Sequence, residues 1–310
     1  MKIFNSIQDF TTNSATVLTL GTFDGVHKGH KTIIDKLTAT AKAAGAASTV
    51  LTFFPHPRMV LQQHSDIKLL NTINEKAYLL EQCGVDNLII HPFDHAFSRL
   101  TAEEFVKDIL FDKLNINHII IGYDHRFGRN RTATITDLER FGEQYGFEVI
   151  QISALEIDEV SVSSTKIRNA LDSGDIVTAN SFLGYPYLLT GTVVKGKEIG
   201  RTIGFPTANI DIAEDYKLIP PIGIYVVSSI IDGKNVFGMM SIGTNPTVGG
   251  TTRTIEVNYL DYDGDLYGKE LRISLYSKIR DEEKFESLDA LKEQLVKDGQ
   301  ATRAFFQNLL

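Results

Sequence analysis

The fold of the first half of the chain is decided by one stretch, Gly21-Thr22-Phe23-Asp24-Gly25-Val26-His27-Lys28-Gly29-His30. A short apolar run, 16–20, precedes it, and a segment with apolar residues at helical spacing, 31–44, follows it. The pattern predicts a turn from a buried strand into a helix, with Gly29 and His30 near the helix N-terminus. Unpaired main-chain N–H groups and the positive end of the helix dipole meet there, which favours an anion such as a phosphate.

Two histidines in this stretch are candidates for chemistry. His27 and His30 are three residues apart, which places both on one side of a helical turn. An imidazole can donate a hydrogen bond to negative charge that develops on a phosphate. The alternative is a glycine turn with two surface histidines. The strand before the motif and the helix after it favour the phosphate site, since context is what gives a short motif its meaning.

The whole stretch resembles the HxGH signature of the nucleotidyltransferase superfamily, and in full it is similar to the FAD synthetase branch. The resemblance implies that His27 and His30 are catalytic. It also implies that Gly21, Phe23 and Gly29 bind ATP and its phosphates.

Length and composition set outer limits. The chain has 310 residues, of which 43% are apolar and 23% charged, a profile typical of a globular protein with about two domains. Its net charge of −8 argues against nucleic acid or an anionic membrane as a partner. A single cysteine, Cys83, excludes an intrachain disulfide and a cysteine metal cluster. The N-terminus lacks the apolar core of a signal peptide, and no apolar run approaches membrane-spanning length, so we expect a cytoplasmic enzyme.

The secondary-structure pattern changes along the chain. Strands and helices alternate as far as residue 152, which predicts an α/β domain with a doubly wound parallel sheet. In such sheets ligands bind beyond the carboxyl ends of the strands, so the clusters around His27, His56 and Asp124 should converge. Short strands follow from Tyr187 onward and predict a small antiparallel β-barrel, with hairpin turns at 232–233 and 263–264 and a closing helix at 287–297. We place the domain boundary between residues 184 and 185.

Two further motifs of the first domain match the same family. Ser163-Ser164-Thr165-Lys166-Ile167-Arg168 opens a helix, and hydroxyl groups there could be no more than a cap. It is similar to the SST-x-IR motif of the FAD synthetases, which implies that Ser163, Ser164 and Thr165 hold ATP phosphates and that Arg168 is catalytic. The segment 122–128 matches another family element and implies flavin contacts at Asp124 and Phe127. The sequence departs from the family at His125, where Phe is usual.

The second domain carries a glycine-rich segment of its own, Gly196-Lys197-Glu198-Ile199-Gly200-Arg201-Thr202-Ile203-Gly204-Phe205-Pro206-Thr207-Ala208-Asn209. It is not a P-loop, because Glu198 stands where Ser or Thr is required and no long helix is predicted after it. Thr207 and Asn209 alternate to one face of a strand, and hard oxygen ligands of this kind suit Mg²⁺ beside nucleotide phosphates. A glycine turn that leads into a strand is the alternative.

This segment closely resembles the riboflavin kinase signature, which implies that Gly196 and Gly204 cover ATP phosphates and that Thr207 and Asn209 hold Mg²⁺. Glu256 stands at the position of the family's catalytic base. Asn258 occupies a position that is often His. Arg280 lies in a segment similar to the family's flavin end, although a solvated charge run is the alternative for its neighbours.

The two signatures, in this order, resemble the bacterial bifunctional riboflavin kinase/FAD synthetase family. That resemblance implies ATP-dependent phosphorylation of riboflavin to FMN, and then adenylylation of FMN to FAD with release of pyrophosphate. Two alternatives stay open from the residues. One is a nucleotidyltransferase with another substrate and a non-catalytic barrel. The other is a flavin-binding regulator that has lost catalysis.

Overall fold

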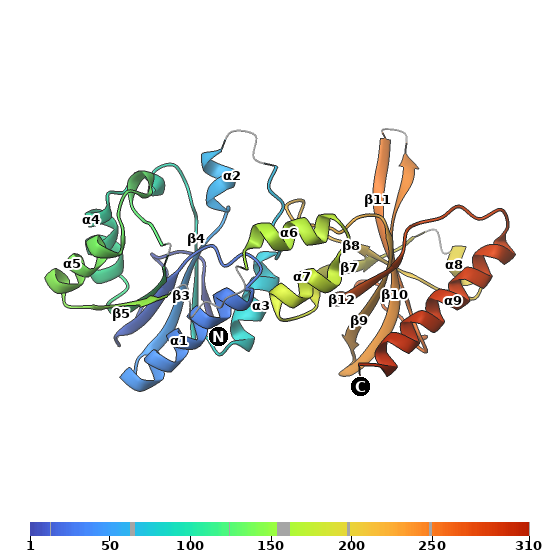
Figure 1. Cartoon of the computed structure of the whole chain (residues 1–310), viewed down its shortest axis with the longest axis horizontal. Coiled ribbons are helices and arrows are strands. Elements are labelled where there is room, and N and C mark those ends of the chain that lie inside the picture. Colours follow the sequence, from blue (N-terminus) through green and yellow to red (C-terminus); the bar gives the residue numbers. More distant parts are fainter. Residues whose placement is uncertain are drawn as a thin grey trace. The chain divides into compact units, whose positions relative to one another are not determined.

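A computed structural model describes residues 1–12, 14–62, 66–123, 125–153, 162–196, 199–247 and 250–309 (Figure 1). These residues form two compact units, Met1–Ser163 and Ser164–Leu310, each with its own sheet. Among the helices in these ranges, none is long and apolar enough to cross a membrane.

The first unit is built on a six-stranded parallel sheet in the order β1-β4-β3-β2-β5-β6, as the alternating pattern predicts. The strands are β1 (Lys2–Phe4), β2 (Thr16–Leu20), β3 (Ala47–Phe53), β4 (Asn87–His91), β5 (Ile116–Gly122) and β6 (Glu148–Ile152). From β2 the chain runs outward through β3 and β4, and then returns to the other side of β2 for β5 and β6. The sheet therefore has its topological switch point between β2 and β5, where ligands bind in folds of this class.

Helices cover both faces of this sheet. The helical elements are α1 (Lys28–Ala44), α2 (Pro57–Leu61), α3 (Ile73–Gln82), α4 (Ala102–Glu104), the π-helical η2 (Phe105–Phe111) and α5 (Ile135–Tyr145), with short 3₁₀ turns η1 (Phe97–Arg99) and η3 (Arg129–Arg131). On one face, side chains of β2, β3 and β5 share a core with Phe105, Leu110 and Phe141. On the other face, α1 packs its buried side chains against the same strands. Burial on both faces explains why β2 reads as a continuous apolar run.

The second unit is a closed antiparallel barrel in the order β10-β11-β8-β7-β12-β9. Its strands are β7 (Tyr187–Val194), β8 (Ala208–Asp211), β9 (Gly223–Ile231), β10 (Lys234–Thr247), β11 (Gly250–Tyr259) and β12 (Glu270–Arg280). The predicted hairpin turn at Asp232-Gly233 is confirmed, since both residues have positive φ and join β9 to β10. The predicted hairpin at Asp263-Gly264 is wrong: β11 pairs with β10 and β8, and β12 with β7 and β9, so residues 260–269 form a longer crossing.

In the described part of this unit the helices are α6 (Ser164–Asp172), α7 (Ile176–Leu183), α8 (Ile199–Thr202) and the closing helix α9 (Leu288–Gln307). Gly174, with φ of 79°, separates α6 from α7. Helix α7 packs against β7 and β12 of the barrel (Figure 1). The Asn180 side chain donates to the Leu275 carbonyl at 2.8 Å and accepts from the Tyr187 N–H at 2.8 Å. Residues 164–184, which the sequence pattern groups with the first domain, therefore pack with the second unit.

Substitution of Asn180 tests whether α7 contributes to the stability of the barrel. We expect Asn180→Ala to lower the free energy of unfolding of the second unit by about 1–3 kcal/mol, because two main-chain groups of the barrel lose their partner. Ser181→Ala is the matched control, since Ser181 bonds only within its own helix, to the Thr178 carbonyl. Urea unfolding followed by tyrosine fluorescence measures both. Equal stability of the two variants would mean that α7 adds nothing to the barrel.

Candidate active sites

The glycine- and histidine-containing stretch from Gly21 to His30 lies at the switch point of the first sheet, between β2 and α1. His27 is the N-cap of α1, and its Nδ1 accepts a hydrogen bond from the His30 N–H at 3.4 Å. The two imidazole rings stack with 3.6 Å between centroids, and the Phe23 ring meets His30 edge-on at 5.1 Å. A Cβ on Gly21 would lie 3.2 Å from the Phe23 ring, so the glycine leaves room for that ring. Both histidines thus lie on one side of the helix N-terminus, as predicted.

Both imidazoles are neutral at neutral pH. Burial lowers the pKa of His27 to about 4. The pKa of His30 is also lowered well below 6.5, first by burial and then by electrostatic interaction with His27 and Lys76. Because His27 Nδ1 accepts a hydrogen bond, its proton is on Nε2, which can donate to a ligand. His30 Nδ1 is enclosed and has no hydrogen-bond partner among the described residues.

The turn itself is strained. Phe23 has φ of 45° and Val26 has φ of 37°, and both side chains are buried. A β-branched residue in this region is a clear outlier. Such backbone costs about 1–3 kcal/mol per residue and persists only where its surroundings fix it. Functional sites are where such strain gathers, which agrees with the position of this turn.

Asp24 and Lys76, which the sequence analysis did not select, are the groups that fix it. Asp24 Oδ1 accepts from the main-chain N–H of Leu70 at 2.9 Å, and Lys76 Nζ donates to the Thr22 carbonyl at 2.7 Å. A signal for Lys76 was present in the sequence. Lys76, Leu79 and Leu80 fall at helical spacing, which puts a lysine on the apolar face of α3.

The other predicted residues of the first domain are distributed as follows. Ser163 ends the first unit, and Ser164, Thr165 and Arg168 lie in the first turns of α6, which begins at Ser164 as the motif predicts. Phe127 is buried in the core of the first unit, where its ring stacks on His125 with 6.2 Å between centroids. Asp124 lies outside the described residues.

In the second unit, the predicted ligands and base come together on one face of the barrel. Thr207 Oγ1 donates to Glu256 Oε2 at 3.0 Å, and Glu256 pairs in register with Asn209 across β8 and β11. Side chains at paired positions of antiparallel strands share a face. Gly196 borders this face, since a Cβ there would lie 2.1 Å from Asn209 Nδ2. Strand pairing therefore brings Glu256 to Thr207 and Asn209, which lie nearly fifty residues earlier in the sequence.

The glycines and Asn258 shape the approach to this face. Gly204 has φ of 85°, and a Cβ on Gly200 would lie 2.2 Å from the Phe205 carbonyl oxygen, so both positions need glycine. Asn258 is buried, and its Nδ2 donates to the Pro206 carbonyl at 2.7 Å. In this chain Asn258 thus holds the residue before Thr207.

Arg280 has a structural partner. Its Nε and Nη2 bond to the Asp298 carboxylate at 3.0 and 2.8 Å, and Asp298 is 1% exposed within α9. Gln294 also donates to that carboxylate. The guanidinium therefore joins the end of β12 to the closing helix, and its flavin contact stays a prediction.

The donor set around Thr207 fits Mg²⁺. A hydroxyl, an amide oxygen and a carboxylate are the hard oxygen ligands that this ion takes, together with water and substrate phosphates. Among the described residues, no group of three or more His, Cys, Asp or Glu side chains could hold a metal by itself. The fit thus depends on oxygen atoms that a nucleotide would add.

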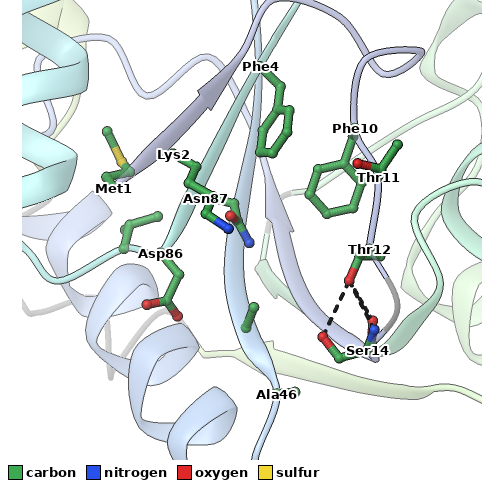
Figure 2. A pocket seen from close by; sticks show the side chains of 12 residues that line it. Met1, Lys2, Phe4, Phe10, Thr11, Thr12, Ser14, Ala46, Asp86 and Asn87 are labelled. Carbon is green, nitrogen blue, oxygen red and sulfur yellow. Dashed lines mark hydrogen bonds between the residues drawn. The ribbon is translucent and has the colours of Figure 1, made fainter.

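A separate hollow of about 620 Å³ lies at the opposite edge of the first sheet. Figure 2 shows its lining, which comes from the amino ends of β1, β3 and β4 and from residues 10–12 and Ser14. Two of its polar side chains are paired: the Asp86 carboxylate accepts from Ser48, and Asn87 donates to Thr49. Because ligands of this fold class bind at the carboxyl edge, we assign no function to this hollow.

Comparison with known proteins covers both units. The family model for FAD synthetase matches residues 9–166, and that for riboflavin kinase matches residues 183–306. Bifunctional riboflavin kinase/FMN adenylyltransferase of Listeria monocytogenes is 40% identical over 97% of this chain and 96% of its own length. The Escherichia coli K12 protein of the same name is 36% identical over 99% of this chain and 98% of its own length. A crystal structure titled as a macrolide-efflux protein from Streptococcus pneumoniae has a TM-score of 0.87 and 33% identity, and it covers 97% of this chain and 98% of its own.

Buried neutral histidines also predict a pH dependence of stability. The pKa of His27 is about 4 in the folded chain against 6.5 when exposed, so the unfolded state binds more protons between these values and stability falls as pH drops from 6.5 to 4. Between pH 7 and pH 4.5 we expect wild type to lose roughly 2–3 kcal/mol more than His27→Asn, which keeps a cap but does not titrate. His95→Asn, at an exposed site, is the control. Urea unfolding followed by circular dichroism measures the difference, and parallel losses in wild type and His27→Asn would contradict a neutral buried His27.

Proposed function

Because this chain belongs to the bifunctional riboflavin kinase/FMN adenylyltransferase family, we propose that each unit performs one activity at the site described above. The barrel phosphorylates riboflavin to FMN, and the parallel-sheet unit adenylylates FMN to FAD. The substrates are riboflavin, FMN and ATP, and we place both reactions in the cytoplasm, where ATP is made available.

In the kinase reaction, the 5′-hydroxyl of riboflavin attacks the γ-phosphorus of ATP, and ADP leaves. A primary alcohol needs an acceptor for its proton, and the Glu256 carboxylate is the base on the Thr207 face. The hydrogen bond from Thr207 to Glu256 Oε2 orients the carboxylate and leaves Oε1 for the substrate hydroxyl. Convergence of Thr207, Asn209 and Glu256 is the observation that carries this assignment.

Mg²⁺ would be held by Thr207 and Asn209 together with nucleotide phosphates. When bound, the ion neutralises charge on the transferred phosphoryl group. The residues of the chain orient the alcohol, accept its proton and keep the glycine segment, with Gly196 and Gly204, close over the phosphates.

In the adenylylation reaction, a phosphate oxygen of FMN attacks the α-phosphorus of ATP, and pyrophosphate leaves. That nucleophile is already an anion, so no base is needed. The task of the chain is to place the two phosphates and to stabilise the charge that develops. The His27 Nε2–H, the His30 imidazole and the N–H groups that begin α1 supply neutral donors for this charge. For Arg168, Ser163, Ser164 and Thr165 we propose contacts with ATP on the strength of the family motif alone.

A substitution in the first unit separates the two activities. We expect His30→Ala to lower adenylylation of FMN by ~10²–10³-fold, the usual effect of removing one preorganised donor, and to leave phosphorylation of riboflavin unchanged. His95→Ala, at an exposed position, is the control. Chromatography of the products formed from FMN, riboflavin and ATP measures both. A folded His30→Ala protein with a normal adenylylation rate would remove His30 from the mechanism.

The complementary substitution is Glu256→Gln, which keeps the shape and the hydrogen bond to Thr207 but cannot accept a proton. Phosphorylation of riboflavin should fall by ~10²-fold or more, while FAD synthesis from supplied FMN stays unchanged. Glu270→Gln, on the exposed side of β12, is the matched control. If Glu256→Gln still makes FMN at nearly the normal rate, or if both activities fall equally, the assignment of the base is wrong.

A further inference from the structure

A lysine lies beneath the strained turn that leads into α1. Lys76, in the first turns of α3, is 3% exposed, and its Nζ donates to the Thr22 carbonyl at 2.7 Å and lies 3.4 Å from Thr52 Oγ1. Thr52 Oγ1 donates to the same carbonyl at 3.2 Å. The ammonium thus holds the residue immediately before Phe23, where the backbone enters the left-handed region.

Asp24 holds the other side of Phe23. Its carboxylate is 2% exposed and accepts from the N–H groups of Leu70 and Asn71, in the segment that leads into α3. Phe23 is therefore fixed between two buried side chains of opposite charge. Strained backbone persists only where contacts of this kind determine it, so these two side chains maintain the shape of the turn.

A buried ammonium is an unfavourable way to fill this space. Methionine has a similar length and would pack without loss of charge hydration. Burial disfavours the charged form of Lys76, and the attraction of Asp24 compensates for only part of that effect. The presence of lysine therefore indicates that a charged hydrogen-bond donor is needed at this position. The turn that it contacts leads directly to the histidines at the start of α1.

We propose that Lys76 is a positioning residue for adenylyl transfer: its ammonium holds the Thr22 carbonyl and so fixes the turn that aims His27 and His30 at the nucleotide. This inference rests on the proposed role of the two histidines. It adds a residue from α3 that touches no reacting atom and acts through the turn.

The proposal makes the protonated form of Lys76 the active one. Burial lowers the pKa of Lys76 to about 8, and the charge of Asp24 opposes the shift. The titratable groups that face it are Asp24 in the turn and the neutral His30 of α1. Strand β3 presents Thr52, which does not titrate, and Glu75, its neighbour in α3, bonds to the Thr72 N–H. Adenylylation should therefore decline as pH rises through about 8, with about one-tenth of the plateau rate left at pH 9.

The experiment is a pH–rate profile of FAD formation from FMN and Mg-ATP by the full chain, between pH 6.5 and 10. We compare wild type, Lys76→Arg, Lys76→Met and the control Lys36→Met, an exposed lysine of α1. Lys76→Arg should move the decline to higher pH, because a guanidinium stays charged. Lys76→Met should lower kcat by roughly 10- to 100-fold with a smaller change in KM, since misaimed groups chiefly affect the rate. Riboflavin phosphorylation by the same samples measures the amount of competent protein.

A wild-type profile that is flat up to pH 10, or a decline that stays at the same pH in Lys76→Arg, would overturn the proposal. The wild-type profile gives this answer even if a variant fails to fold. Normal adenylylation by His30→Ala would instead contradict the proposed function, and the pH profile would still report on Lys76.

Discussion

Pairing of main-chain groups between neighbouring strands is the interaction on which both sites depend. In the first unit, parallel pairing of β2 with β3 and β5 brings three strand ends to one edge and sets the switch point beside the histidines. In the second unit, antiparallel pairing of β8 with β11 sets Glu256 opposite Asn209. A register slip of one residue would turn these side chains to the opposite face, so the chemistry is as well defined as the pairing.

Much of this could be predicted from the sequence because the signals are local. The strand, the glycine turn and the helix around His27 are contiguous, and so is the segment that ends in Asn209. What could not be predicted depends on residues distant in sequence. The neutral state of the histidines comes from burial by the fold. Helical spacing marks Lys76 as a lysine on an apolar face, but its contact with Thr22, like that of Asp24 with Leu70, exists only once α3 packs beneath the turn. Residues 260–269 look like a hairpin until the pairing partners of β11 are known.

Arg280 shows how a family motif and a structural contact can share one side chain. Its guanidinium grips the buried carboxylate of Asp298, and removal of either partner would leave a buried charge without compensation. A substitution of Arg280 would then disturb the packing of helix α9 as well as any flavin contact. A family motif of the first domain is likewise joined to the fold of the second. Helix α6, which starts at the Ser164 motif, belongs to the same compact unit as the kinase site.

Closure of the barrel also governs how this protein avoids unwanted association. Closure gives the six barrel strands a neighbour on both sides over their central parts, although in the described residues the outer ends of β10, beyond Ile242, and of β11, before Glu256, pair with each other alone. The parallel sheet, in contrast, has edges at β1 and β6. Strand β1 is only three residues long and carries an exposed lysine, and β6 begins with an exposed glutamate. Short length and charge are the devices by which sheet edges resist aggregation, so both edges of the parallel sheet are protected in this way.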